Sequence, residues 1–395
     1  MRSIFWEAAL FSPTFPGPCI LIITCCLRIH PFQAVYPNMD FVTSADAFFG
    51  SVREEYVDYQ QSGFFVKSSR ESLYVYQIET PRRTYTGLIG CADADDYRAN
   101  NIRRHEHTLS EKEQQQMHLL IKRKAQVKPV LLTHAPVGAM DDFLRQFVRR
   151  DAPFLDIPLA KEGVVHRFWE IKDGPDIDRI QQWFEGSVPH SYIADGHHRT
   201  STLALMDERL TRKDYQGEFD KILCAFFPVD ELEILDFNRL LDNLNGRSLT
   251  TFLVELSRYF EMRKLDGPTR PERAHELTML LGEEWFGLRW RSRWLEAAGS
   301  PADTLDARLL NRHILCDVLG IDDIRTDPRV RYVGGPAGPE GLLREAQRYD
   351  SAVGFCLYPV DAQDFMRIAD AGDTLPPKST WFEPRMKNGM LVKEF

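Results

Sequence analysis

The sequence contains no Cys-x-x-Cys pair, and its 7 cysteines form an odd set scattered through mainly apolar surroundings. This pattern argues against a disulfide framework and against a structural zinc site of the usual spacing. We therefore expect reduced cysteines and a cytoplasmic location. Neither Gly-x-x-x-x-Gly-Lys nor Gly-x-Gly-x-x-Gly occurs, which argues against the P-loop and Rossmann folds.

The chain also lacks an extended basic run, and its net charge at pH 7 is -9. Nonspecific binding to nucleic acid depends mostly on neutralising backbone phosphates with lysine and arginine. Short basic clusters such as Lys122-Arg-Lys124 are more typical of solvated helix faces. We therefore expect no nucleic-acid partner.

Residues 8–27 are largely apolar, as in a signal peptide or membrane anchor. Glu7 precedes this stretch, however, and prolines such as Pro13 and Pro16 interrupt it, while no convincing small-x-small cleavage site follows. We expect residues 1–28 to be a nonessential extension, for example from an upstream start codon, and we expect no membrane partner. Deleting them should leave stability and ligand binding nearly unchanged.

No internal repeat or low-complexity segment appears in the 395 residues, of which 43% are hydrophobic and 27% charged. This composition is typical of a globular protein with one large or two medium domains. Apolar and β-branched patterns predict strands at 73–79, 84–92, 128–133, 163–171, 190–194, 221–229, 277–281, 285–291 and 352–358. Helical spacing and capping residues predict helices at 110–126, 137–149, 176–185, 200–210, 248–260, 304–319, 339–349 and 361–371. We expect an α+β fold of mixed sheets with flanking helices, and a domain boundary within 236–247.

The densest polar cluster lies in residues 191–201. An apolar run, predicted to be a buried strand, ends at Ala194. Leu203 and Met206 share one face of a predicted helix, so Asp195-Gly-His-His-Arg199 is predicted to form the turn between strand and helix.

Such a turn suits an anion, because it combines free backbone N–H groups with the positive end of the helix dipole. Gly196 lets the backbone approach a ligand closely, and Arg199 adds a forked cation. We expect Gly196, His197, His198 and Arg199 to bind phosphate. Asp195 is the candidate catalytic residue, because a carboxylate beside phosphate is repelled unless it holds a metal ion or accepts a proton. An ordinary capped helix start would explain the same residues.

A second polar cluster, Arg103-Arg-His-Glu-His-Thr108, precedes a polar helix that begins near Leu109. The two clusters together hold four of the 11 histidines, and we expect them to converge on one pocket. Glu106 is a candidate second catalytic acid. His105 and His107 are candidate metal ligands, because imidazoles suit zinc or manganese.

A third candidate is the loop Pro376-Pro-Lys-Ser-Thr380, in which two prolines rigidify a segment that offers an ammonium group and two hydroxyls. Lys378, Ser379 and Thr380 would bind phosphate or carboxylate, and Arg385 would join them. A rigid connection into a final strand, with Lys378 in solvent, explains the same loop.

The chain resembles the bacterial and archaeal proteins grouped as domain of unknown function 1015, from about Ile29 to the C-terminus. Five segments carry this resemblance in the expected order: Leu73-Tyr-Val-Tyr76, Thr86-Gly-Leu-Ile-Gly90, His105-Glu-His-Thr108, Tyr192 to Arg199, and Leu375 to Arg385. The family name assigns no function, so the resemblance indicates kinship and not activity.

Asp-Gly-His-His-Arg before a helix is also similar to the signature of the ParB/sulfiredoxin superfamily, whose turn binds nucleotide phosphates. Members include a nucleotide switch, a sulfinic-acid reductase and free-serine kinases. The kinase turn also carries an aspartate, and Asp195, Gly196, His198 and Arg199 match it. The reductase is disfavoured, because it needs a cysteine where this chain has histidines.

This resemblance implies a ParB/sulfiredoxin-like nucleotide-binding core at residues 29–236 and a C-terminal α/β domain at residues 237–395. The favoured hypothesis is a nucleotide-dependent small-molecule phosphotransferase that uses ATP or ADP with Mg²⁺, with a serine-like amino acid as substrate by superfamily analogy. Two alternatives stay open. One is a metal-dependent phosphoesterase, and the other is a noncatalytic nucleotide-binding regulatory module. The oligomeric state is left open by the sequence.

Overall fold

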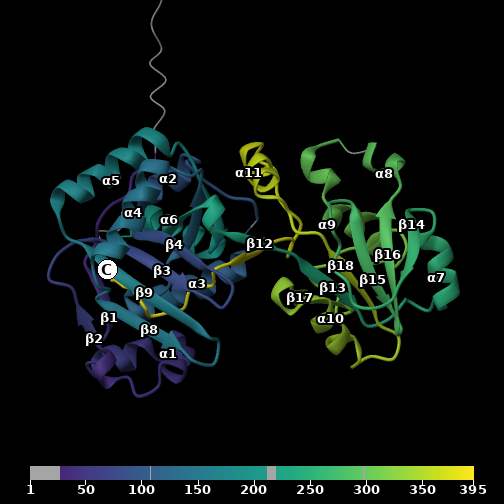
Figure 1. Ribbon diagram of the computed structural model, residues 1–395, viewed down its shortest axis with the longest axis horizontal. Helices are drawn as coiled ribbons and strands as arrows, with labels where there is room; N and C mark the ends of the chain where they lie inside the picture. The colour runs from purple at the N-terminus through teal and green to yellow at the C-terminus, as the bar shows by residue number, and fades with distance from the viewer. Residues whose placement is uncertain (1–26, 107, 211–218, 297–298) are drawn as a thin grey trace, which may run out of the picture.

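The computed structural model describes residues 27–106, 108–210, 219–296 and 299–395. Within these ranges the chain forms two groups of helices and strands, which Figure 1 shows side by side. The predicted α+β class, with mixed sheets and flanking helices, is confirmed. Residues 1–26 and His107, whose roles were predicted above, lie outside the described residues.

An eight-stranded sheet forms the first half. Its strands lie in the order β5 (Ile102–Arg103), β10 (Ser191–Asp195), β7 (Val130–His134), β11 (Lys221–Pro228), β4 (Thr84–Asp93), β3 (Leu73–Glu79), β9 (Val164–Ile171) and β8 (Leu155–Leu159). Most neighbours are antiparallel, but β10 pairs with β5, and β11 with β7, in parallel. Strand β10, which leads into the predicted turn, therefore lies one strand from an edge of a mixed sheet.

Both faces of this sheet are buried, because alternate side chains of one strand enter different cores. In β3, Tyr74 and Tyr76 belong to one hydrophobic core, whereas Leu73 and Val75 belong to the other. A strand that is covered on both faces has a nearly continuous apolar sequence. This explains the run Leu73-Tyr-Val-Tyr76.

Helices cover the two faces. One face carries α4 (Gly138–Arg150), α5 (Gly174–Ser187) and α6 (His197–Leu210), and the other carries α1 (Ala45–Gln61) and α11 (Ala362–Asp370). Two further helices, α2 (Ala94–Arg98) and α3 (Ser110–Arg123), both lie against α6. Helix α6 is thus held between the sheet and two neighbouring helices.

A six-stranded antiparallel sheet forms the second half. Its order is β14 (Phe260–Leu265), β16 (Glu284–Trp290), β15 (Glu276–Leu281), β18 (Val353–Leu357), β13 (Phe237–Leu241) and β17 (Val330–Gly334). One face packs against α10 (Gly338–Ala346), and the other against α7 (Leu249–Leu256), α9 (Asp306–Leu309) and a π-helix (Leu310–Cys316). The remaining short helices are α8 (Ser292–Glu296) and the 3-10 turns Met39–Phe41, Val229–Glu231, Pro301–Thr304 and Gly335–Ala337. The helix expected at 304–319 is thus α-helical up to Leu309 and π-helical from Leu310.

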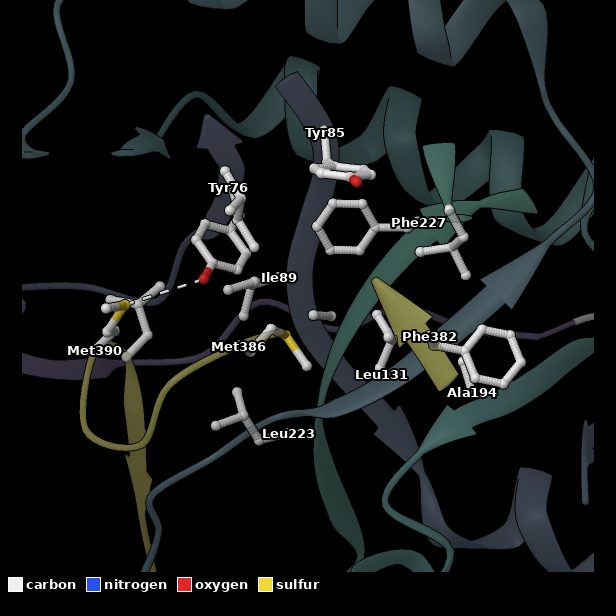
Figure 2. Packing of buried hydrophobic residues seen from close by; sticks show 14 of the residues in the cluster. Tyr76, Tyr85, Ile89, Leu131, Ala194, Leu223, Phe227, Phe382, Met386 and Met390 are labelled. Atoms are coloured by element: carbon white, nitrogen blue, oxygen red, sulfur yellow. Dashed lines mark hydrogen bonds between the residues drawn. The ribbon is translucent and has the colours of Figure 1, made fainter. Parts of the chain in front are cut away.

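After β18 the chain returns to the first half, as the yellow segment of Figure 1 shows. Strand β19 (Trp381–Glu383) pairs with β12 (Glu233–Leu235), and β20 (Val392–Glu394) lies between β1 (Ala34–Pro37) and β6 (Ala125–Gln126), in a sheet completed by β2 (Phe65–Lys67). Figure 2 shows Met386 and Met390 of this segment packed in the same core as Tyr76 and Leu223. The segment treated above as one C-terminal domain, 237–395, is therefore shared between the two halves.

Leu27 is the first described residue, and it is fully buried in the core beneath α4, α5 and α6. Its backbone N–H donates to the Val188 carbonyl at 3.3 Å. The core thus includes a residue two positions before the boundary expected at residue 29. None of the described helices is both long enough and apolar enough to cross a lipid bilayer.

We expect Leu27→Ala to lower the free energy of unfolding by about 2–5 kcal/mol, because it removes a fully buried leucine from a close-packed core. Arg28→Ala is the matched control, since the Arg28 side chain is 61% exposed and should change stability by less than about 0.5 kcal/mol. Denaturant unfolding measures both. Equal stability of the two variants would show that Leu27 does not belong to the core.

Candidate functional site

Strand β10 ends at Asp195 and α6 begins at His197, so the predicted strand–turn–helix is present. Between them, Gly196 has a φ of +114°, a conformation that residues with a side chain rarely adopt. A Cβ atom at this position would lie 2.7 Å from Nη2 of Arg199. Gly196 therefore lets Arg199 fold back along the turn toward Asp195.

Three cations surround the partly buried carboxylate of Asp195. Its Oδ2 accepts hydrogen bonds from Arg199 Nη2 at 3.1 Å and from Lys128 Nζ at 3.2 Å, while Oδ1 lies 4.0 Å from Arg385 Nη1. Burial alone would raise the pKa of Asp195, but the three positive charges together hold it well below its usual value. Asp195 is therefore ionised at neutral pH and accepts protons poorly.

The two histidine clusters meet beside this network, as the sequence predicted. The rings of His105 and His197 are both buried, and their centroids lie 4.4 Å apart in an edge-to-face arrangement. One potential ligand atom from each of His105, Glu106 and His197 lies within 4.8 Å of the other two. Segments about ninety residues apart in the sequence thus form one cluster.

Both buried imidazoles are neutral. Burial lowers the pKa of His197 to about 3, and it lowers the pKa of His105 well below its usual value. His105 donates a ring N–H to the carbonyl of Ile193. The other ring nitrogen, His105 Nδ1, and Nε2 of His197 are buried and have no hydrogen-bond partner among the described residues. These two nitrogens are the unsatisfied polar atoms of the cluster.

His198 has a different position from His197. Its Nε2 accepts a hydrogen bond of 3.1 Å from the backbone N–H of Leu109, just before α3. Burial lowers the pKa of His198 as well. His198 therefore joins the start of α6 to the segment that follows Glu106, and it adds no positive charge at neutral pH.

The loop Pro376–Thr380 completes the site from the C-terminal segment. The backbone N–H of Leu375 donates to the carbonyl of His105 at 2.8 Å, which anchors the loop beside the histidines. Lys378 has a φ of +56°, in the left-handed region. Ser379 is buried and its hydroxyl donates to a carbonyl within the loop at 2.7 Å. That donor is therefore already used.

These residues line two adjoining cavities. The turn cavity, of 380 Å³, lies at the start of α6, and four of its residues also line the histidine cavity, of 120 Å³: Glu106, Asp195, His197 and Lys378. Thr380 and Arg385 line the histidine cavity but not the turn cavity. The turn cavity has six basic residues, which are Arg53, Lys112, Arg123, Lys128, Arg199 and Lys378, against two carboxylates. In a chain with a net charge of -9, this local excess of cations indicates an anion site.

The two carboxylates of the turn cavity have oppositely shifted pKa values. Burial raises the pKa of Glu106, and the charges of Lys378 and Lys112 offset this only in part. Asp195 is shifted downward, as described above. Carboxylates whose environments separate their pKa values typically have different roles, one remaining ionised while the other exchanges a proton.

Lys128 was missed in the sequence analysis. It precedes β7 and contacts Asp195 from the neighbouring strand. The local signal is weak, because one lysine at the start of an apolar run is common in strands. Arg385, which was expected only to join the C-terminal loop, also faces Asp195 and stacks on Trp381 with its guanidinium carbon 3.9 Å from the ring centroid.

Fold and site together define an α+β protein with a cation-rich cavity at a strand–turn–helix junction. The chain belongs to the family described as Protein of unknown function (DUF1015), whose model matches residues 35–308. No curated protein sequence matches the chain.

Several solved structures align with most of the chain at low identity. A free serine kinase mutant in complex with AMP has a TM-score of 0.40 and 11% identity, covering 75% of this chain and 87% of that one. A truncated SbnI from Staphylococcus aureus has a TM-score of 0.40 and 12% identity, covering 76% and 84%. A conserved hypothetical protein from Pyrococcus furiosus has a TM-score of 0.39 and 11% identity, covering 78% and 95%. Similarities at this level assign no function.

We expect Gly196→Ala to cost roughly 1–3 kcal/mol of stability, because alanine strains the turn backbone and its Cβ displaces Arg199. Gly50→Ala in α1 is the control, since a Cβ there meets no atom within 4 Å and alanine favours helix by up to about 1 kcal/mol. Thermal unfolding compares them. A Gly196→Ala variant as stable as Gly50→Ala would refute the constraint on the turn.

Proposed function

We propose that the chain is a nucleotide-dependent small-molecule phosphotransferase. The observation that carries this proposal is the turn cavity, where a helix start and six cations surround two carboxylates with oppositely shifted pKa values. Phosphoryl transfer depends mainly on positioning and charge neutralisation, and requires little covalent chemistry from the protein. The resemblance of the turn to that of free-serine kinases agrees with this chemistry.

Nucleotide phosphates would bind at the start of α6. There the free backbone N–H groups and the helix dipole favour negative charge, and the guanidinium of Arg199 with the ammonium groups of Lys128 and Lys378 neutralises it. His197 and His198 would contribute as neutral groups, because burial keeps both uncharged. Arginine and lysine therefore supply the positive charge of the site.

Asp195 would remain ionised and orient the cations rather than act as the base. Its depressed pKa makes it a poor proton acceptor, and two hydrogen bonds already occupy Oδ2. Oδ1 is less engaged, since it accepts no hydrogen bond from the described residues and lies 4.0 Å from Nη1 of Arg385. Mg²⁺ commonly binds one or two carboxylates together with substrate phosphates, and would neutralise phosphate charge in the same way. Oδ1 is the atom suited to hold it.

Glu106 would accept the proton from the acceptor hydroxyl. Its raised pKa makes it a better base than Asp195. It lines the turn cavity together with Asp195, but belongs to the polar cluster of residues 103–108. As the hydroxyl oxygen bonds to the terminal phosphorus of ATP, its proton passes to Glu106, and the bond from phosphorus to the bridging oxygen breaks to release ADP. A serine-like amino acid is the acceptor that the superfamily resemblance suggests.

A metal-dependent phosphoesterase is the second candidate, and a specific observation favours it. His105 Nδ1 and His197 Nε2 are buried and have no partner in the described part of the chain. One potential ligand atom from each of His105, Glu106 and His197 lies within 4.8 Å of the other two. The ring N–H that His105 donates to Ile193 would orient it, as outer partners orient metal-bound histidines. Two imidazoles and a carboxylate suit zinc, manganese or iron. Glu106 would then be a ligand and unavailable as a base.

Arg199→Ala should weaken the binding of ADP with magnesium about tenfold or more, because a charge-assisted hydrogen bond to phosphate contributes about 1.5–3 kcal/mol. Arg209→Ala is the matched control, since Arg209 is exposed near the other end of the same helix. Titration calorimetry measures both affinities. An unchanged dissociation constant for Arg199→Ala would exclude the turn as the phosphate site.

Glu106→Gln separates the candidate functions. For a phosphotransferase, the variant binds ADP normally but loses most transfer, and the wild-type rate falls as the pH decreases through the raised pKa of Glu106, because the base must be ionised. Coupled assays of ADP formation measure this. A phosphoesterase would instead contain stoichiometric zinc or manganese that His105→Ala loses and that His118→Ala, an exposed control on α3, retains.

Stoichiometric nucleotide binding by the wild type, without transfer to any acceptor, would indicate the noncatalytic regulatory module. If ADP forms at the wild-type rate in Glu106→Gln, Glu106 is not the base.

A further inference from the structure

A third cavity, of 600 Å³, lies where the two halves meet, and we call it the large cavity. Glu106, Lys112 and Lys378 line both this cavity and the turn cavity. The rest of its wall comes mainly from the second half and from the loop that carries Lys378. The two cavities therefore share a wall at the carboxylate proposed as the base.

We propose that the large cavity binds the hydroxyl-bearing acceptor, and that this acceptor is an anionic molecule larger than a free amino acid. The transfer of phosphate to that hydroxyl rests on the proposed function, whereas the binding of the molecule to the cavity does not. Glu106 borders both cavities, so a hydroxyl held in the large cavity meets a phosphoryl group held in the turn cavity.

The volume of the cavity sets the size of the ligand. At about 30 Å³ for each water molecule, 600 Å³ corresponds to about twenty waters. Serine has seven non-hydrogen atoms and would leave most of this space to solvent. Pockets of about 300–1,000 Å³ typically enclose ligands several times larger than that.

The charge of the wall favours an anion. Five basic residues face three acidic ones, namely Lys112, Arg308, Arg312, Arg325 and Lys378 against Glu106, Asp322 and Asp323. Arg308 has structural partners, since it contacts Asp303 at 2.9 Å and the Thr374 carbonyl at 2.6 Å. Arg312 is exposed and makes no ion pair with the described residues. Arg312 is therefore one of the cations available to a carboxylate.

The wall also offers apolar and neutral polar contacts. Leu109, which is 41% exposed, and the half-buried Ile324 supply apolar surface that would cover a carbon chain. Asn311, next to Arg312 in the π-helix, has a buried side-chain oxygen without a partner among the described residues. A ligand hydroxyl or amide would satisfy that oxygen. π-Helical turns occur often at functional sites, and this one places both side chains on the cavity wall.

A series of probes tests the size and the charge of the ligand on the full chain. The probes are L-serine, straight-chain carboxylic acids of two, four and six carbons with a terminal hydroxyl, and the six-carbon amino alcohol as a cationic control. Saturation-transfer NMR and calorimetry measure binding without nucleotide. We expect affinity to rise with length, the six-carbon acid to bind at least about tenfold more tightly than serine, and the amino alcohol not to bind.

Two variants locate the binding site. Arg312→Ala should raise the dissociation constant of the six-carbon acid about tenfold, which is the usual effect of losing one charge-assisted contact. Arg348→Ala is the control, because its side chain is 69% exposed and it does not line the large cavity; its affinity should equal that of the wild type. Three results would each overturn the proposal. Serine could bind as tightly as the longest acid, no acid could bind at millimolar concentration, or Arg312→Ala could bind the six-carbon acid as tightly as the wild type.

The same samples separate this inference from the proposed function. If the six-carbon acid binds through Arg312 but ATP gives no ADP with either the acid or serine, the large cavity is a binding site and the phosphotransferase is wrong. If ADP forms with serine alone and the longer acids do not bind, the phosphotransferase stands and the acceptor assignment fails.

Discussion

The ion pairs of Asp195 are the interaction on which the site depends. A carboxylate removed from water is costly unless opposite charges compensate it. Here the charges come from three places: Lys128 before β7, Arg199 on α6, and Arg385 in the C-terminal segment. One carboxylate thus orients three cations from distant parts of the chain. An anion entering the turn cavity meets cations already in position, which reduces the reorganisation that binding requires.

The local features of the site could be predicted, because they depend on residues that are close in the sequence. The apolar run ending at Ala194 and the helical spacing of Leu203 and Met206 predict β10 and α6, and the structure has both. Gly196 adopts a backbone conformation that its residue type favours. The convergence of the histidine clusters was also predicted, although the contact between the rings of His105 and His197 was not.

Features that depend on distant residues could not be predicted. Nothing near Lys128 in the sequence indicates Asp195, since the contact arises from the pairing of β7 with β10. The division at residue 237 overlooked the return of the chain, because nothing in β20, a final strand of 3 residues, indicates that it pairs with β1 and β6. Helix α1 was also missed. Its buried positions Phe48, Val52 and Tyr56 are spaced by four, but acidic and polar residues between them obscure the pattern.

The pairing of β20 with β1 and β6 has a consequence for how the protein is made. Arg385 follows Asp195 by 190 residues, which is 385 minus 195. At about 5–20 residues per second, a ribosome needs roughly 10–40 s to synthesise that interval. During this time the nascent first half lacks both Arg385, the third cation beside Asp195, and strand β20. Joining ends so distant in the chain is also entropically expensive and slow. The ion pairs of Asp195 are therefore complete only after these 190 residues have been synthesised.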